Sequence, residues 1–230
     1  MATSPTEIEV FPASDNTLLV RFRLQGGSEA NQQVLALAWQ LQREQANRLL
    51  NLHPAYETLL IRFDPRVESH AGLETLIRKS LKSRLPELPN RRQVDVPVCY
   101  GGKFGPDLEQ VARLAQLTPA QVIEIHSSVT YQVCFLGFAP GFPYLGGMNH
   151  RIAVPRLDSP RKEVAPGAVG IADAQTGIYP VASPGGWRLI GRTYLRLFRP
   201  EESSPSLLNP GDQLRFRPIS PEQYERHSHE

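Results

Sequence analysis

The stretch from Gly137 to Trp187 constrains the fold more than any other part of this sequence. It contains nine glycines and seven prolines in 51 residues. Proline breaks a helix interior and glycine weakens one, so this composition excludes long helices here. Short β-prone segments lie within and around it, at residues 130–136, 169–171, 188–190, 194–198 and 213–218. Many short strands separated by Gly/Pro turns predict a β-barrel or a β-sandwich.

The first hundred residues show a different pattern, in which strands alternate with helices. Apolar residues recur at helical spacing in two places, and β-rich runs surround them. The expected strands are residues 8–11, 17–24, 56–63 and 91–99, and the expected helices contain residues 34–41 and 73–77. The order ββαβαβ predicts a small α+β sandwich of ferredoxin-like kind. We therefore expect an N-terminal α+β domain at residues 1–100 and a C-terminal β-barrel domain at residues 101–230.

Composition argues against several functional classes. The chain has 25 Lys and Arg against 23 Asp and Glu, with no basic block, which argues against a nucleic-acid partner. No window approaches the roughly 20 apolar residues of a membrane span, and the polar N-terminus lacks a signal-peptide core. Cys99 and Cys134 have no metal-ligand spacing and fit buried thiols in a reducing compartment. We expect a cytoplasmic protein with no metal site.

Two short helices are predicted between the domains' main elements. Asp107 is followed three residues later by Gln110, and Thr118 by Gln121, with Pro119 at the first helical turn. Each pair has the spacing of a capping box, in which the first side chain binds a free backbone N–H.

An aromatic loop stands out at residues 136–147, with the sequence LGFAPGFPYLGG. Phe138, Phe142 and Tyr144 alternate with residues that fix or free the backbone, including Pro140. Such a loop holds rings outward in one shape and loses little entropy on binding. The alternative is a tight barrel corner whose aromatic side chains pack inward.

A second region at residues 175–192 offers polar groups beside further rings. Gln175 carries a donor and an acceptor, while Tyr179 and Trp187 have polar edges. Arg192 has a planar guanidinium suited to carboxylate or phosphate, with a surface ion pair as the alternative. For Trp187 the alternative is a core residue. Farther upstream, Arg156 and Arg161 flank a turn that could meet an anion or a partner subunit.

His126 closes the second short helix just before a strand. A lone histidine there could be functional, but packing or capping is the alternative, because imidazolium is favoured at a helix C-terminus. No complete catalytic motif accompanies it. Residues 101–105 (GGKFG) are not a P-loop, because no Gly-Lys-Ser/Thr follows. The chain also lacks G-x-S-x-G and H-E-x-x-H, which favours a binding or docking surface over a self-sufficient active site.

Several long motifs in one order resemble the PxpB/KipI family, also called allophanate hydrolase subunit 1. They are residues 97–108 (PVCYGGKFGPDL), 126–128, 136–147, 154–156, 175–180 (QTGIYP), 183–187 (SPGGW), 190–193 and 205–212. The resemblance covers nearly the whole chain. One departure lies at residues 164–170, where VAPGAVG replaces the family's VPAGSVG, so the backbone of that turn is expected to differ locally.

The resemblance implies an N-terminal α+β domain and a C-terminal cyclophilin-like β-barrel. It also implies partners: a homologous C subunit that shares a cleft with this chain, and an A subunit. Together such subunits open the lactam ring of 5-oxo-L-proline to L-glutamate and consume ATP. Because no phosphate-cradling loop is visible, we expect ATP to be bound elsewhere in the complex. A second branch of the family inhibits a sensor histidine kinase, which remains the alternative function.

On this basis we assign site roles as hypotheses. His126 is expected to transfer or orient a proton, Gln175 to bind the lactam, and Arg192 to hold a carboxylate or phosphate. The expected substrate-binding residues are Phe138, Pro140, Phe142, Tyr179 and Arg156.

Overall fold

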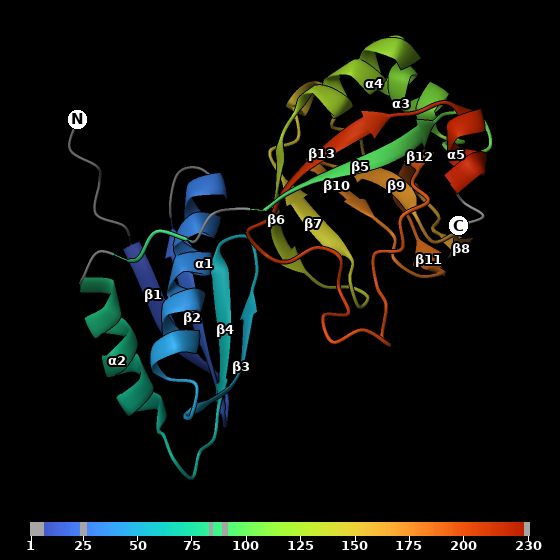
Figure 1. The fold of residues 1–230 in the computed structure, drawn as a ribbon. Helices are drawn as coiled ribbons and strands as arrows, with labels where there is room; N and C mark the ends of the chain where they lie inside the picture. Colours follow the sequence, from blue (N-terminus) through green and yellow to red (C-terminus); the bar gives the residue numbers. More distant parts are fainter. Residues whose placement is uncertain (1–6, 24–26, 83–84, 89–91, 228–230) are drawn as a thin grey trace. The chain divides into compact units, whose positions relative to one another are not determined.

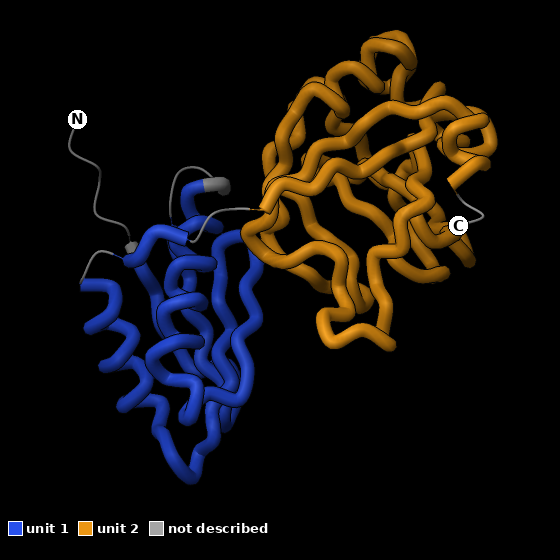
Figure 2. Tube along the Cα trace, in the orientation of Figure 1, with its two compact units in different colours: residues 1–91 blue, residues 92–230 orange. Residues whose placement is uncertain are grey.

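The computed structural model describes residues 7–23, 27–82, 85–88 and 92–227. The chain divides into two compact units, Met1–Arg91 and Arg92–Glu230 (Figure 2). Of the helices within the described ranges, none combines the length and apolar character that a bilayer span requires.

The first unit is a two-layer sandwich of one sheet and two helices. Its elements are β1 (Glu7–Ser14), β2 (Thr17–Arg23), α1 (Gly27–Glu44), β3 (Leu49–Pro54), β4 (Thr58–Phe63) and α2 (His70–Lys82). The sheet is antiparallel with the strand order β1-β2-β4-β3. Alternate residues of β2 and β4, among them Val20 and Ile61, face one core that also receives Leu37 of α1 and Ile77 of α2. Both helices therefore cover the same face of the sheet.

The expected element order of the first unit was wrong in two places. Strand β3 was missed, because its residues alternate only weakly between buried and exposed. The strand expected at residues 91–99 is β5 (Gln93–Tyr100), which belongs to the barrel of the second unit. It pairs in parallel with β13 (Gln213–Pro218), more than a hundred residues away, and alternation along a strand does not reveal its partner. The expected order ββαβαβ is therefore ββαββα, and the second unit begins before β5.

The second unit is built around a closed barrel of seven strands in the order β10-β7-β6-β13-β5-β12-β9. The other barrel strands are β6 (Tyr131–Leu136), β7 (Pro143–Gly146), β9 (Ala168–Ala172), β10 (Gln175–Ile178) and β12 (Arg188–Arg192). A separate two-stranded sheet pairs β8 (Arg161–Val164) with β11 (Ser183–Gly185). Its helices are α3 (Leu108–Ala115), α4 (Pro119–Ser128), the short 3-10 helix η1 (His150–Ile152) and α5 (Pro221–His227). The α+β class and the C-terminal barrel are thus confirmed.

The barrel interior is filled with side chains and is closed by helices. Val96, Val133, Ile171 and Leu214 from four strands meet in one buried cluster that also includes Val122 of α4. Figure 1 shows α3 and α4 together over one end of the barrel. A barrel of this strand number is just wide enough for side chains to fill, so its interior is a core.

The strand expected at residues 194–198 does not form. The backbone there makes only an isolated bridge between Phe198 and Ser206. The segment packs instead against the aromatic loop, since a side chain added at Gly141 would lie 2.9 Å from Cβ of Phe198. Gly141 also has a φ of +80°, so both its backbone angle and this close approach require glycine.

Candidate functional site

His126 lies inside the barrel and is fully buried. Its Nδ1 is 2.8 Å from Oη of Tyr100, and its Nε2 is 3.0 Å from Oγ1 of Thr176. The Thr176 hydroxyl donates to the carbonyl of Gly170 at 2.9 Å. Because a hydroxyl carries one proton, Oγ1 must accept from Nε2–H, and Nδ1 therefore accepts from the Tyr100 hydroxyl. Both ring nitrogens of a neutral imidazole are thus already bonded.

The surroundings of His126 keep it uncharged. Its ring stacks on Phe216 with centroids 4.4 Å apart. Burial lowers the pKa of His126 from 6.5 to about 3 and raises the pKa of Tyr100 well above its usual value. The expected proton-transfer role does not fit this position, since the ring has no exposed atom for a substrate to reach. Val122 and His126 lie four residues apart on the buried face of α4, and that spacing was the sequence signal for a core histidine.

Three of the expected substrate-binding residues do lie together. The Phe138 ring is 5.4 Å from that of Phe142 and 6.1 Å from that of Tyr179, and Phe142 and Tyr179 are 5.2 Å apart. Trp187 completes the cluster at 5.4 Å from Phe142. All four contacts are edge-to-face, the geometry that aromatic pairs prefer. Residues from three separate segments thus form one aromatic cluster.

Only Phe138 of these rings is largely exposed. Its side chain is 62% exposed, whereas Phe142 and Tyr179 are buried behind it. The loop is held by backbone bonds from Gly137 N–H to the Phe142 carbonyl and from Phe142 N–H to the Ala139 carbonyl. Phe138 has a φ of +67°, a left-handed conformation that is unfavourable for a bulky residue. Both alternatives for this loop therefore apply, with Phe138 held outward and Phe142 packed inward.

The expected polar residues lie at separate places around the barrel. Gln175 is half-buried at the start of β10, opposite Ala172 of β9. Arg192 ends β12, where its Nε donates to the Pro166 carbonyl at 2.9 Å.

Arg156 lies near the aromatic cluster and pairs with Asp173 at 3.4 Å. Burial raises the pKa of Tyr179, and the nearby positive charge of Arg156 acts in the opposite direction. Arg156 therefore lies near the aromatic cluster, whereas His126 lies in the core.

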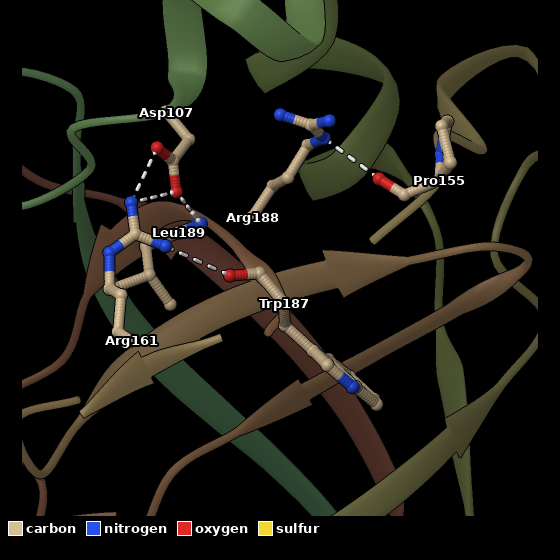
Figure 3. Close-up of polar contacts among 6 residues, drawn as sticks. All are labelled: Asp107, Pro155, Arg161, Trp187, Arg188 and Leu189. Carbon is tan, nitrogen blue, oxygen red and sulfur yellow. Dashed lines mark hydrogen bonds and ion pairs between the residues drawn. The ribbon is translucent and has the colours of Figure 1, made fainter. Parts of the chain in front are cut away.

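A charged cluster at the start of β12 was not predicted from the sequence (Figure 3). Asp107 was expected to cap α3, but its side chain makes no capping bond. Its carboxylate instead accepts from Arg161 Nη2 at 2.7 and 2.8 Å and from the backbone N–H of Leu189 at 2.7 Å. In this contact both partners are ionised, whereas a helix cap would offer the carboxylate only neutral N–H groups. The capping box of Thr118 and Gln121 on α4, by contrast, is confirmed.

Arg188 is a second residue of this cluster that was not predicted. It is 7% exposed, and its Nε donates to the Pro155 carbonyl at 2.7 Å. An arginine at the start of an apolar strand was the available signal, because a buried strand rarely contains a charge without a reason.

The glycine-rich loop at residues 101–105 does not fit the phosphates of ATP. The backbone N–H groups of Gly101, Phe104 and Gly105 already bind carbonyl oxygens, and Lys103 pairs with Glu225 at 2.8 Å. The acidic Asp107 stands where the loop enters α3 and would repel a phosphate.

Metal ligands and hollows were compared with the expected site positions. Within the described residues, no three His, Cys, Asp or Glu side chains gather closely enough to hold a metal ion. A shallow hollow beside α4 is lined by Gln121, Glu124, Ile125, Ser128 and Arg151, none of which is an expected site residue.

Comparison with known proteins gives consistent matches over most of the chain. A family model described as "Carboxyltransferase domain, subdomain C and D" matches residues 8–208. The 5-oxoprolinase B subunit of Bacillus subtilis (strain 168) is 43% identical over 227 residues, which cover 94% of this chain and 95% of that protein.

Solved structures match as well. The crystal structure of TTHA0988 has a TM-score of 0.78 and 38% identity over 89% of this chain, which spans 40% of that longer chain. The urea carboxylase of Kluyveromyces lactis matches 98% of this chain, which spans 23% of that enzyme, with a TM-score of 0.77. At 21% identity, this last likeness concerns the fold alone.

Proposed function

The chain belongs to the family of 5-oxoprolinase B subunits, which are carboxyltransferase-domain proteins, and we propose that it is the B subunit of an ATP-dependent 5-oxoprolinase. The observation that carries this proposal is the 43% identity to the B. subtilis protein, which extends over nearly the full length of both chains. In this role the chain is a non-autonomous subunit that works with a homologous C subunit and an A subunit to convert 5-oxo-L-proline to L-glutamate.

The exposed aromatic loop is the proposed contact with the C subunit. Phe138 and Pro140 are exposed, and the backbone bonds of the loop and the edge-to-face contacts with Phe142 and Tyr179 fix the position of Phe138. A rigid, exposed aromatic side chain loses little conformational entropy when it is buried in a partner's pocket. Phe142 and Tyr179 support this contact from behind.

The lactam and its carboxylate require polar partners, and Gln175, Arg156 and Arg192 are the proposed ones. Gln175 can both donate to and accept from an amide. Arg156 and Arg192 offer guanidinium groups to an anion. Among the described residues, a moderate ion pair engages Arg156 and a carbonyl contact engages Arg192. His126 supports this site indirectly, because its hydrogen bonds stabilise the barrel core.

ATP is proposed to bind to the other subunits of the complex. The loop at residues 101–105 has its N–H groups engaged, and an amide is too poor an electrophile to be hydrolysed readily without activation. We place this reaction in the cytoplasm, where ATP is available and where the buried thiols of Cys99 and Cys134 stay reduced.

The test is ATP-dependent release of glutamate from 5-oxo-L-proline by the three purified subunits, with this chain omitted as the control. We expect no release without it. Single substitutions Gln175→Ala and Arg192→Ala in the assembled complex are expected to lower kcat/KM, while the exposed Leu114→Ala on α3 leaves it unchanged.

Equal glutamate release with and without this chain would contradict the proposal. Capture of partners from the native lysate separates it from kinase inhibition. Recovery of a C-type subunit supports the oxoprolinase, and recovery of a sensor histidine kinase in its place would contradict it.

A further inference from the structure

Arg188, the first residue of β12, carries a positive charge that no carboxylate among the described residues balances. Its side chain and that of Trp187 extend to opposite sides of the chain, and only Trp187 joins the aromatic cluster (Figure 3). The residue is 7% exposed, and its Nε donates to the Pro155 carbonyl at 2.7 Å. Its Nη1 is buried and has no hydrogen-bond partner among the residues that the structure describes.

The neighbouring carboxylates are already engaged. Asp107 holds Arg161 with both oxygens, at 2.7 and 2.8 Å, and binds Leu189 N–H as well. Asp173 pairs with Arg156 at 3.4 Å, next to the Pro155 that binds Arg188. The cluster therefore contains three arginines and two aspartates, and Arg188 is the arginine without a carboxylate in the described part of the chain.

A buried guanidinium without an anion is unfavourable, because it has lost water and gained only one carbonyl contact. Proteins keep such groups where a ligand supplies the missing charge. The fork of Nη1 and Nη2 matches the two oxygens of a carboxylate. Pro155 lies in an exposed segment between η1 and β8, so the guanidinium lies directly beneath the surface of the second unit.

We propose that Arg188 is the counter-ion of a small-molecule carboxylate, and that its fixed Nε contact with Pro155 orients the fork toward that ligand. A carboxylate carries one negative charge and balances the single unpaired cation, whereas a phosphate dianion would exceed it and meet Asp107 and Asp173. The identity of the ligand as 5-oxo-L-proline rests on the proposed function. The existence of the carboxylate site does not.

The experiment uses the full chain with the substitution Trp39→Phe, so that Trp187 is the remaining tryptophan and its fluorescence is measured. Trp187 immediately precedes Arg188 in the sequence. The chain is titrated with 5-oxo-L-proline, acetate, inorganic phosphate and pyrrolidin-2-one, which is the same lactam without its carboxylate. We expect saturable binding of 5-oxo-L-proline and acetate. Arg188→Gln should weaken both about tenfold or more, as expected for loss of a charge-assisted contact, and should leave any binding of pyrrolidin-2-one unchanged.

Two further variants distinguish a loss of ligand binding from a merely structural effect. Arg196→Gln is the matched control, because Arg196 is exposed and pairs with Glu201 at the surface. Arg188→Lys keeps the charge but loses the fork, so its affinity should lie between those of wild type and Arg188→Gln. Without ligand, the melting temperature of Arg188→Gln should equal or exceed that of Arg196→Gln, because an unbalanced buried charge has been removed.

Several outcomes would overturn the site. They are unchanged affinity in Arg188→Gln, tighter binding of phosphate than of either carboxylate, a large fall in melting temperature, and no saturable carboxylate binding by the wild-type chain alone or in the complex. The proposed function fails separately. Acetate binding through Arg188 without glutamate release by the complex would retain the site and contradict the oxoprolinase. An active complex whose KM does not change in Arg188→Gln would retain the oxoprolinase function and contradict the carboxylate site.

Discussion

Asp107 binds Nη2 of Arg161 with both carboxylate oxygens, at 2.7 and 2.8 Å, although the two residues are 54 positions apart in the sequence. The same carboxylate accepts from the backbone N–H of Leu189. One side chain thus joins the segment before α3 to β8 and to β12.

We expect Asp107→Ala to lower the free energy of unfolding by about 2–3 kcal/mol, because it leaves Arg161 and the Leu189 N–H without an acceptor. The Asp107 side chain is 9% exposed, so water replaces it poorly. Urea unfolding at neutral pH measures the change. The matched control is Asp95→Asn, which breaks the half-exposed pair with Arg217 and should change stability by less than about 0.5 kcal/mol. Equal losses in the two variants would contradict the structural role of Asp107.

The hydroxyl of Thr176 should be required for the barrel core. Thr176→Val keeps the shape but leaves Nε2–H of His126 without its acceptor and removes the hydroxyl's bond to the Gly170 carbonyl, at a cost of about 1–3 kcal/mol. Thr176→Ser retains the hydroxyl and should lose less. Chemical unfolding of both variants decides the matter, and an equal or smaller loss in Thr176→Val would show that the hydrogen-bond chain is unimportant.

His126 should make the protein less stable in acid. Its pKa is about 3 when folded, against 6.5 for an exposed imidazole in the unfolded chain, so the unfolded state binds the extra proton first. Stability from this residue is fully present above pH 6.5 and is lost as the pH falls from 6.5 toward 3, by at most about 1.4 kcal/mol per pH unit.

The pH effect is measured as the free energy of unfolding between pH 7 and pH 4. His126→Gln should reduce its slope, since glutamine does not titrate, and His150→Gln at an exposed position serves as the control. A slope that is the same in wild type and His126→Gln would contradict the buried, neutral imidazole.

Phe138 should matter for assembly and little for folding. Phe138→Gly removes an exposed ring and relieves the left-handed φ of +67°, while the added freedom of glycine in the unfolded chain opposes that gain. We expect its stability to stay within about 1 kcal/mol of wild type. Its affinity for the C subunit should fall about tenfold or more, as for a central aromatic contact. Calorimetric titration of the two subunits measures this, with Leu114→Ala as the control, and wild-type affinity in Phe138→Gly would remove the loop from the interface.

The sequence by itself determined the features that depend on near neighbours. Glycine and proline between Gly137 and Trp187 act on their own backbone angles, so the change from helices to the short strands of a β-barrel or β-sandwich was visible without a structure. The Thr118–Gln121 capping box was predicted for the same reason, since its donors and acceptors lie within one helical turn. The clustering of Phe138 with Phe142 also follows from a short loop.

Tertiary structure decided everything that depends on a distant partner. Strand β5 looks like any half-buried strand, and only its pairing with β13 and β12 assigns it to the barrel. Asp107 fits a helix cap in sequence, but a guanidinium from β8 outcompetes the local N–H groups for its carboxylate. For His126 and Arg188, too, the sequence did not reveal which partners surround the buried side chain. Burial with two hydrogen-bonded neighbours makes the histidine a core residue. Burial without a carboxylate makes the arginine a binding candidate, because the free energy of a charged or polar group depends on partners that the fold alone brings together.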